Sequence, residues 1–374
     1  MKILCLINNL SSGGAQRQLV MLAKLLRQRG HNVSFVTYHA ADFFAAQLRE
    51  SEIPIQCIEE PRALPRVVKI RKALRHGDQD VVLSFLDIPN FLSELAAIPN
   101  RRWGLVVSER SANIAGMCSW RGRFLRRWHR IADAVVTNSA ATRQILVARF
   151  PHLRKKLWTI YNAVDLDLFS PAWGETPRRE GRTTILVAAS YRRLKNLHGL
   201  IQAAALLNPA ERARLRIEWY GSLTTRHGNT DAYEEARRAV AAGGLGDCIA
   251  LHAAVPNIHA YMRDADVVGL FSLYEGLPNA ICEGMACGKP IIMSEVSDAQ
   301  VLVEPKVNGF LCDPRDPASI AEALRAVIGL SPVSRLTMGR QSRLKAELLF
   351  HPDRILDQYL AVLQAARAAH ESMA

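Results

Sequence analysis

Short apolar runs alternate along the chain with longer segments in which apolar residues recur at helical spacing. Residues 2–7 predict a strand, residues 8–14 a loop, and residues 15–29 a helix with one apolar face that Gly30 can cap. Further strands are predicted at 32–38, 80–85, 103–108 and 133–139. This alternation is typical of parallel strands joined by crossover helices, so the expected fold class is α/β.

The same plan restarts after residues 159–171, which are expected to form a linker. A strand at 183–190, a loop rich in Arg and Lys, and a helix at 197–207 open the second half; more strands follow at 216–221, 248–253, 266–272 and 290–294. Two Rossmann-like sheets that face each other across a cleft are therefore expected. The predicted parts are a domain over 1–165, a domain over 166–351 and a helical tail over 352–374.

Length and composition agree with this plan, because 374 residues exceed one ordinary α/β domain. The chain has no apolar run long enough to cross a membrane. The apolar stretch at its start is too short for a signal peptide. A cytoplasmic location is therefore expected. The seven cysteines are scattered without metal-site spacing and are expected to be reduced thiols.

The net charge of +13 is unevenly distributed. Residues 1–165 contain 25 Lys and Arg against 12 Asp and Glu, whereas residues 166–374 contain 23 of each. A basic first half favours an anionic partner: a phospholipid surface, a phosphorylated acceptor or nucleic acid. Composition alone leaves these three open.

The strongest candidate site lies in residues 267–295, where a predicted strand, a loop and a helix follow one another. Pro278 suits the start of a helix that is expected to run from about Asn279 to Cys287, and this places Glu275 in the loop and Glu283 one turn into the helix. The helix start suits an anion such as a diphosphate, and carboxylates accept hydrogen bonds from sugar hydroxyls. A nucleotide sugar has both kinds of group, although the bare spacing of the two glutamates also fits two solvated surface residues.

The sequence YEGLPNAICEGMACGKP, which contains both glutamates, resembles the signature of glycosyltransferase family 4. The segments SSGGAQ, YNAVDLDLFSP and NGFLCDPRDPASIAEAL extend the resemblance over nearly the whole chain. Membership would imply the two-domain GT-B fold, a tail helix that crosses back to the first domain, and sugar transfer with retention at the anomeric carbon.

The resemblance also implies roles for individual residues. Glu275 would lie beside the transferred sugar and Glu283 would hold the ribose, while Arg192 and Lys195 would bind the diphosphate, with Arg193 as an alternative to Arg192. The other expected donor-binding residues are Gly14, Leu277, Asn279 and Ala280. Many members have a histidine facing the sugar at the strand end where this chain has Ser108, Glu109 and Arg110.

The expected reaction is transfer of a hexose-type sugar from a nucleotide sugar, with UDP as the expected nucleotide, to a polyprenyl-diphosphate-linked or other glycan acceptor. No cofactor is expected, and no metal, because the positive end of the predicted helix at Asn279 and Ala280 and the cations of the loop at 191–196 can stabilise the departing diphosphate. A nucleotide-sugar 2-epimerase of the same plan is the second enzymatic alternative. A nucleic-acid-binding protein is the third alternative, supported by charge alone and lacking a nucleic-acid-binding motif.

Residues 118–132 combine aromatic and basic side chains at helical spacing. The aromatic residues Trp120, Phe124 and Trp128 favour a stripe that faces the core, whereas the arginines favour acidic lipid head groups, as could those of residues 62–77. The candidate residues for contact with the acceptor or with an anionic membrane are Arg110, Arg123, Arg126 and Arg127. Peripheral association with the inner face of the cytoplasmic membrane is expected.

Overall fold

The computed structural model describes residues 1–110, 114–173, 181–223 and 230–371. Contacts within the chain divide it into two compact units, Met1–Ala163 with Pro352–Ala374, and Val164–His351. The chain passes from the first unit to the second inside the segment expected to be a linker. The final helix belongs to the first unit, as expected for a tail that returns to it.

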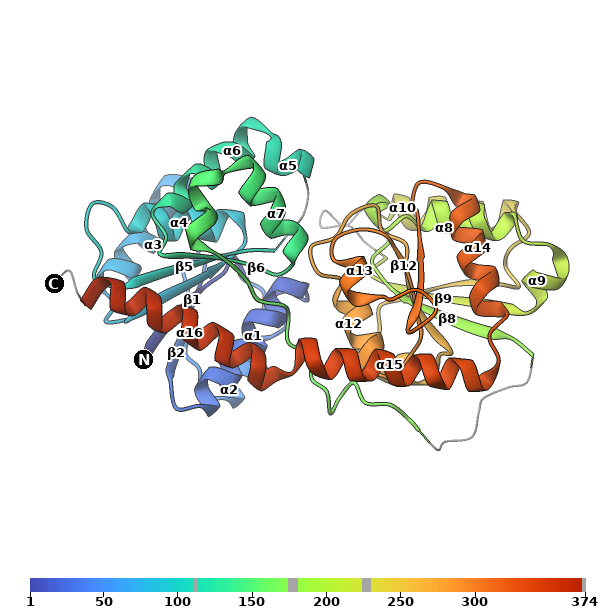
Figure 1. Ribbon diagram of the computed structural model, residues 1–374. Helices are drawn as coiled ribbons and strands as arrows, with labels where there is room; N and C mark the ends of the chain where they lie inside the picture. Colours follow the sequence, from blue (N-terminus) through green and yellow to red (C-terminus); the bar gives the residue numbers. More distant parts are fainter. Residues whose placement is uncertain (111–113, 174–180, 224–229, 372–374) are drawn as a thin grey trace. The chain divides into compact units, whose positions relative to one another are not determined.

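The first unit contains a parallel sheet with the strand order β3-β2-β1-β4-β5-β6-β7 (Figure 1). Its strands are β1 (Lys2–Leu6), β2 (Asn32–Thr37), β3 (Ile55–Cys57), β4 (Val81–Phe85), β5 (Gly104–Glu109), β6 (Ala134–Thr137) and β7 (Leu157–Thr159). Along β1, Ile3 and Cys5 belong to one hydrophobic cluster and Leu4 and Leu6 to another, because successive side chains lie on opposite faces. Both faces of this sheet are therefore buried.

Helices cover the two faces of this sheet. They are α1 (Gly14–Gln28), α2 (Ala45–Glu50), α3 (Ala63–His76), α4 (Asp87–Ala96), α5 (Ile114–Cys118), α6 (Trp120–Arg127), η1 (Trp128–Arg130), α7 (Ala140–Arg149), η2 (Pro151–Lys156) and α16 (Pro352–Glu371). The red helix of Figure 1, α16, packs against α1, β4 and β5. A Cβ on Gly104 would lie 2.6 Å from the backbone of Ala366, so glycine permits this close packing.

The second unit contains a parallel sheet with the order β10-β9-β8-β11-β12-β13. Its strands are β8 (Thr183–Ala188), β9 (Leu215–Gly221), β10 (Ile249–Ala253), β11 (Val267–Leu270), β12 (Ile291–Ser294) and β13 (Gly309–Cys312). In the first unit, the six strands β3-β2-β1-β4-β5-β6 have the same order relative to the sequence. Both units therefore have the Rossmann-like arrangement that the sequence predicts.

Most helices of the second unit lie in the connections between its strands, whereas α14 and α15 follow its last strand, β13. They are η3 (Arg193–Lys195), α8 (Leu197–Ala205), α9 (Pro209–Ala213), α10 (Asp231–Ala242), α11 (Ile258–Asp264), α12 (Asn279–Ala286), α13 (Ala299–Leu302), α14 (Pro317–Ile328) and α15 (Pro332–Phe350). Helix α12 begins directly after Pro278 and ends one residue before the predicted Cys287. Gly288, at φ 67°, then reverses the chain.

Two contacts fix α12 in this unit. A Cβ on Gly284 would lie 2.7 Å from Cβ of Val268, so α12 lies directly on β11 at this glycine. At the other end, Arg343 of α15 donates a 2.8 Å hydrogen bond to the carbonyl oxygen of Ala286, which is the last residue of the helix. The packing of α12 therefore sets the position of Glu283, the neighbour of Gly284.

We expect Gly284→Ala to lower the free energy of unfolding by about 1–3 kcal/mol, the usual cost of an extra methyl group in a packed interior. The matched control is Gly246→Ala, because a Cβ on Gly246 has no atom within 4 Å. Urea denaturation of both variants measures the difference. Equal stability of the two would contradict the close packing of α12 on β11.

Candidate active site

The candidate site lies where strands β8 and β11 of the second unit run side by side. The chain leaves β8 towards β9 on one side and leaves β11 towards β12 on the other. Ligands of such sheets bind at the carboxyl ends of the two strands at this switch point. The loops that follow these strands are residues 189–196 and 271–278, and the backbone N–H of Leu273 joins them by donating to the carbonyl oxygen of Leu194 at 2.9 Å.

An ion pair connects the two loops at the side-chain level. Nζ of Lys195 donates to Oε1 of Glu275, and Oγ of Ser272 donates to the same oxygen at 2.6 Å. The side chains of Lys195 and Glu275 are only 17% and 12% exposed. The structure therefore brings together two residues that the sequence predicts for this site, and adds Ser272, which ends the strand run that precedes Glu275.

Asn196 anchors the loop that carries Lys195. Its backbone is left-handed (φ 60°), a conformation that asparagine tolerates better than most residues. Its Oδ1 accepts from the N–H of Gly199 at 3.3 Å and caps α8, while its Nδ2 donates to the carbonyl oxygen of Pro314 at 2.7 Å. Sequence reasoning missed this role, although an asparagine directly before a helical segment is a typical N-cap.

The other predicted donor-binding residues lie on the segment from Glu275 into α12. Leu277 and Glu283 are each 6% exposed, and Asn279 and Ala280 are half-buried at the first two positions of the helix. Backbone N–H groups in the first turn of a helix point out of its N-terminal end, where the helix dipole is positive. Glu275 in the loop and Glu283 in the helix occupy the places that the sequence predicts.

The two arginines of the first loop lie differently. Arg192 is exposed and donates from Nε to Oγ of Ser190 at 3.3 Å, and Arg193 pairs with Glu235 at 3.3 Å. Both line a hollow of about 250 Å³ that residues of α8 and α10 complete. Among the predicted cations of this loop, Lys195 is thus the one whose described contacts reach the glutamate.

In the first unit, Gly14 is exposed as the first residue of α1, after the loop that follows β1. Buried Gln16 holds this loop: its Nε2 donates to Oδ1 of Asn8 at 3.2 Å and to Oδ1 of Asn9 at 3.1 Å. Oδ1 of Asn9 also accepts from Oγ of Ser11 at 3.0 Å. Gln16 has a positioning role that sequence reasoning missed, although it belongs to the quoted segment SSGGAQ.

Arg110 follows β5 at the carboxyl edge of the first sheet. Its guanidinium lies over the ring of Phe85, 3.9 Å from the centroid, and Nη1 donates to Oδ1 of Asn162 at 2.9 Å. Burial lowers its pKa below the ordinary arginine value, with an opposing effect from Tyr359. Arg110 is therefore a half-buried cation in a fixed position where strands β4 and β5 end.

Two family models match the chain in succession. The model of Glycosyltransferase Family 4 matches residues 12–168, and the model of glycosyl transferases group 1 matches residues 174–344. The chain belongs to glycosyltransferase family 4.

Two curated relatives of this chain are named as glycosyltransferases. D-inositol 3-phosphate glycosyltransferase 1 of Catenulispora acidiphila is 29% identical over 63% of this chain and 58% of its own length. The chain thus spans little more than half of that relative. An N-acetylgalactosaminyltransferase of Campylobacter jejuni is 28% identical over 88% of this chain and 89% of its own length. The name of that relative gives its acceptor as a glycan attached to PP-undecaprenol.

Solved structures match this chain over nearly its whole length. The crystal structure of Anabaena HepE in complex with UDP has a TM-score of 0.85 and 21% identity, and covers 98% of this chain and 100% of its own. The complex of HepE with UDP and glucose has a TM-score of 0.84 and 22% identity with the same coverage. The glycosyltransferase therefore has the GT-B fold, which confirms the fold expected from its sequence.

Arg126 of the glycosyltransferase corrects one sequence-based expectation. It was expected to contact the acceptor or lipid head groups, yet it is 3% exposed and its Nη2 lies 2.8 Å from Oε2 of Glu109 and 3.2 Å from Oδ1 of Asp87. His129 joins the same cluster, with Nε2 2.8 Å from Oε1 of Glu109 and Nδ1 2.6 Å from Oε1 of Glu94. The helical spacing could not reveal that Arg126 faces inward to buried carboxylates.

The cluster strongly perturbs the pKa values of its members. Burial alone would raise the pKa of Glu109, but Arg126 and His129 hold it at about 2. Burial would likewise lower the pKa of His129, but Glu94 and Glu109 raise it to about 10. Both ions are therefore charged at neutral pH.

The aromatic residues of α6 correct a second expectation. They were expected to face the core, yet Trp120 is 83% exposed and Phe124 is 49% exposed. Phe124, Trp128 and Phe91 of α4 form a ring cluster with centroids 5.2–6.2 Å apart. Arg123 and Arg127 are exposed on the same helix, so α6 presents aromatic and basic side chains to solvent.

Helix α3, the other basic segment, uses part of its charge inside the unit. Nη1 of Arg71 donates to the carbonyl oxygen of Leu95 at 2.9 Å, and Nη1 of Arg75 donates to that of Ala96 at 3.2 Å. These carbonyls end α4, where cations are favourable. Arg71 and Arg75 therefore stabilise a helix end.

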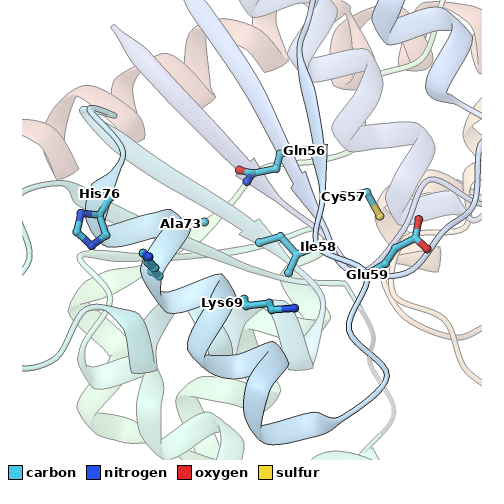
Figure 2. A pocket seen from close by; sticks show the side chains of 8 residues that line it. Gln56, Cys57, Ile58, Glu59, Lys69, Ala73 and His76 are labelled. Atoms are coloured by element: carbon cyan, nitrogen blue, oxygen red, sulfur yellow. The ribbon is translucent and has the colours of Figure 1, made fainter.

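A hollow of about 500 Å³ opens beside strand β3 and helix α3 (Figure 2). Its lining residues are Gln56, Cys57, Ile58, Glu59, Lys69, Lys72, Ala73 and His76. Figure 2 shows His76 at one end and Cys57 and Glu59 at the other. None of the residues predicted to bind donor or acceptor lines this hollow.

Within the described ranges, no helix is long and apolar enough to cross a membrane. The same part of the chain contains no group of three or more His, Cys, Asp or Glu side chains placed to hold a metal ion.

The raised pKa of His129 predicts how stability depends on pH. Because the folded pKa of about 10 exceeds the ordinary value of 6.5, the contribution of the charged ring is complete below pH 6.5 and is lost as the pH rises towards 10. We expect the free energy of unfolding to fall across this interval, and His129→Gln to remove much of the slope. Urea denaturation between pH 6 and 10 measures it.

The matched control is His152→Gln, which replaces an exposed histidine of the same unit and should keep the slope of the parent protein. Nitrogen chemical shifts of the His129 ring provide a second measurement that needs no variant. A ring that loses its proton below pH 7 would contradict the charged cluster.

Proposed function

We propose that the chain transfers a hexose-type sugar from a UDP-sugar to a hydroxyl group of a lipid-linked or other glycan acceptor, with retention at the anomeric carbon. The observation that carries this proposal is the Lys195–Glu275 ion pair beside the start of α12, at the switch point of the second sheet. The UDP and glucose of the HepE complexes and the undecaprenol-linked acceptor of the Campylobacter relative support the donor and acceptor classes.

The charges of the site fit the bond that must break. Cleavage of a sugar–phosphate bond leaves negative charge on the departing diphosphate, and preplaced positive groups lower the barrier. In the proposed mechanism, Lys195, Arg192 and the first N–H groups of α12 at Asn279 and Ala280 stabilise this charge. Gly14, which is exposed as the first residue of α1 after β1, is also assigned to donor binding.

The glutamates take the hydroxyl groups of the donor. A carboxylate has only acceptor atoms, so it recognises hydroxyl groups and not phosphate oxygens. We assign Glu283 to the ribose and Glu275 to the transferred sugar, with Leu277 in contact with the donor. The acceptor hydroxyl attacks from the face that the diphosphate leaves, and a phosphate oxygen takes its proton, which retains the anomeric configuration without a covalent enzyme intermediate.

We assign Arg110 of the first unit to the phosphate of the acceptor. Its guanidinium is held over Phe85 at the carboxyl edge of the sheet, and a guanidinium pairs well with phosphate oxygens. An undecaprenol-linked acceptor, as in the name of the Campylobacter relative, would supply such a group.

Replacement of the two glutamates should have different effects. Glu283→Gln should raise the dissociation constant for UDP by about tenfold, because the carboxylate loses a charged hydrogen bond to the ribose. Glu275→Gln should leave UDP affinity within about twofold and lower kcat by roughly 100-fold, since its contact is with the reacting sugar. Calorimetry with UDP and UDP release from UDP-sugars with membrane extract as acceptor measure both.

Glu322→Gln is the matched control, because Glu322 is an exposed glutamate of α14 in the same unit. The assignment fails if both site variants match this control. Release of UDP at the same rate without extract would instead indicate donor hydrolysis or epimerisation.

We further propose that the first unit associates peripherally with an anionic membrane through α6. Exposed Trp120 and Phe124 would enter the interfacial region, and Arg123 and Arg127 would contact acidic head groups. Such association would bring the enzyme to a lipid-linked acceptor.

The paired change Arg123→Gln with Arg127→Gln should weaken binding to vesicles that contain phosphatidylglycerol by about 30-fold, since each surface cation contributes about 1 kcal/mol. The control pair Arg154→Gln with Lys155→Gln removes the same charge from exposed positions of η2. Vesicle sedimentation measures both pairs, with phosphatidylcholine vesicles as the uncharged reference. Equal loss in the two pairs would mean that net charge, and not α6, determines binding.

A further inference from the structure

One member of the buried ion cluster in the first unit reaches solvent. Glu94, Glu109, Arg126 and His129 are at most 3% exposed, whereas the side chain of Asp87 is 51% exposed. The charges alternate along the cluster in the order Glu94, His129, Glu109, Arg126, Asp87. Nη2 of Arg126 contacts both Glu109 and Asp87, so it connects the exposed carboxylate to the buried groups.

Asp87 stands at the edge of the sheet where ligands of Rossmann-like folds bind. It is the first residue of α4, and only Leu86 separates it from β4. Strand β4 pairs with β1, whose following loop leads to Gly14. Leu86, between β4 and Asp87, has φ 82°. A positive φ is an unfavourable backbone conformation for a leucine and costs about 1–3 kcal/mol. This backbone turn sets the point at which α4, and with it Asp87, begins.

Stability alone gives no reason for such a cluster. Removing charges from water is costly, and well-packed apolar residues in place of a buried ion pair are often equally or more stable. The cluster instead restricts the Asp87 carboxylate, because Arg126 is itself fixed by Glu109. A carboxylate has about four acceptor positions, and Arg126 takes one of them.

We propose that Asp87 binds hydroxyl groups of the acceptor sugar and that Arg126 is its positioning residue. The inference rests on the proposed function, in which the first unit binds a glycan acceptor. Asp87 contributes to acceptor recognition and takes no part in binding UDP, which is assigned to the second unit. Recognition by a fixed carboxylate favours an acceptor with free hydroxyl groups near the attacking one.

The test uses the full chain with UDP-glucose as donor and undecaprenyl-diphosphate-linked oligosaccharides extracted from bacterial membranes as acceptor. Asp87→Asn should raise the acceptor KM by about tenfold, because a neutral amide replaces a charged acceptor of hydrogen bonds. The dissociation constant for UDP, the rate at which the enzyme hydrolyses UDP-glucose without an acceptor, and the midpoint temperature of unfolding should stay unchanged. Asp78→Asn, at an exposed aspartate of the same unit, is the matched control and should keep the parental KM.

Arg126→Lys tests the positioning role without leaving Glu109 unpaired. Lysine keeps the charge but lacks the planar fork of arginine, so the acceptor KM should rise several-fold while UDP affinity is kept. An unchanged acceptor KM in Asp87→Asn, with normal transfer by the parent protein, overturns this inference alone. Failure of the parent protein to bind UDP overturns the proposed function as well, so the two failures are distinguishable.

Discussion

Lys195 and Glu275 neutralise each other where strands β8 and β11 end, and the geometry of the candidate site depends on this ion pair. Both side chains are more than four-fifths buried, so separating them without a replacement partner would leave a poorly solvated charge. Ser272 and Asn196 hold the two sides of the pair, one through a hydroxyl group and the other through a cap on α8. A cation and a carboxylate are thereby kept at adjacent positions, as a ligand with phosphate and hydroxyl groups requires.

The two units share a strand order but use charge differently. In the second unit, the charges of interest lie in loops at strand ends. In the first unit, several basic side chains bind groups of the unit itself: Arg126 binds buried carboxylates, Arg71 and Arg75 bind carbonyls at the end of α4, and Lys156 donates to the carbonyl oxygens of Arg130 and Ala132. A net charge counted along a sequence therefore overstates the positive field that a partner meets, because cations bound to carbonyls or carboxylates are partly compensated.

Local signals in the sequence predicted where the candidate residues of the second unit lie relative to its strands and helices. Pro278 marks the start of α12, and strand periodicity places Glu275 after β11, because both depend on neighbouring residues only. The inward orientation of Arg126 depends instead on Glu109, 17 residues away, and Asp87, 39 residues away. The exposure of Trp120 had no local signal either, since an amphipathic pattern does not say which face is covered.

The support of the second-unit site comes from within that unit. Gly284 sets α12 on β11, Arg343 binds its last carbonyl, and Asn196 ties the Lys195 loop to Pro314 before α14. Each contact joins elements that the sheet already places together, so Glu275, Glu283 and Lys195 gain fixed positions without help from the first unit. Such preorganisation reduces the ordering that a ligand must impose on the protein when it binds. The positions of the residues proposed to bind the donor are thus determined by the fold of the second unit alone, whereas the residues proposed to bind the acceptor, Asp87 and Arg110, are held by contacts within the first unit.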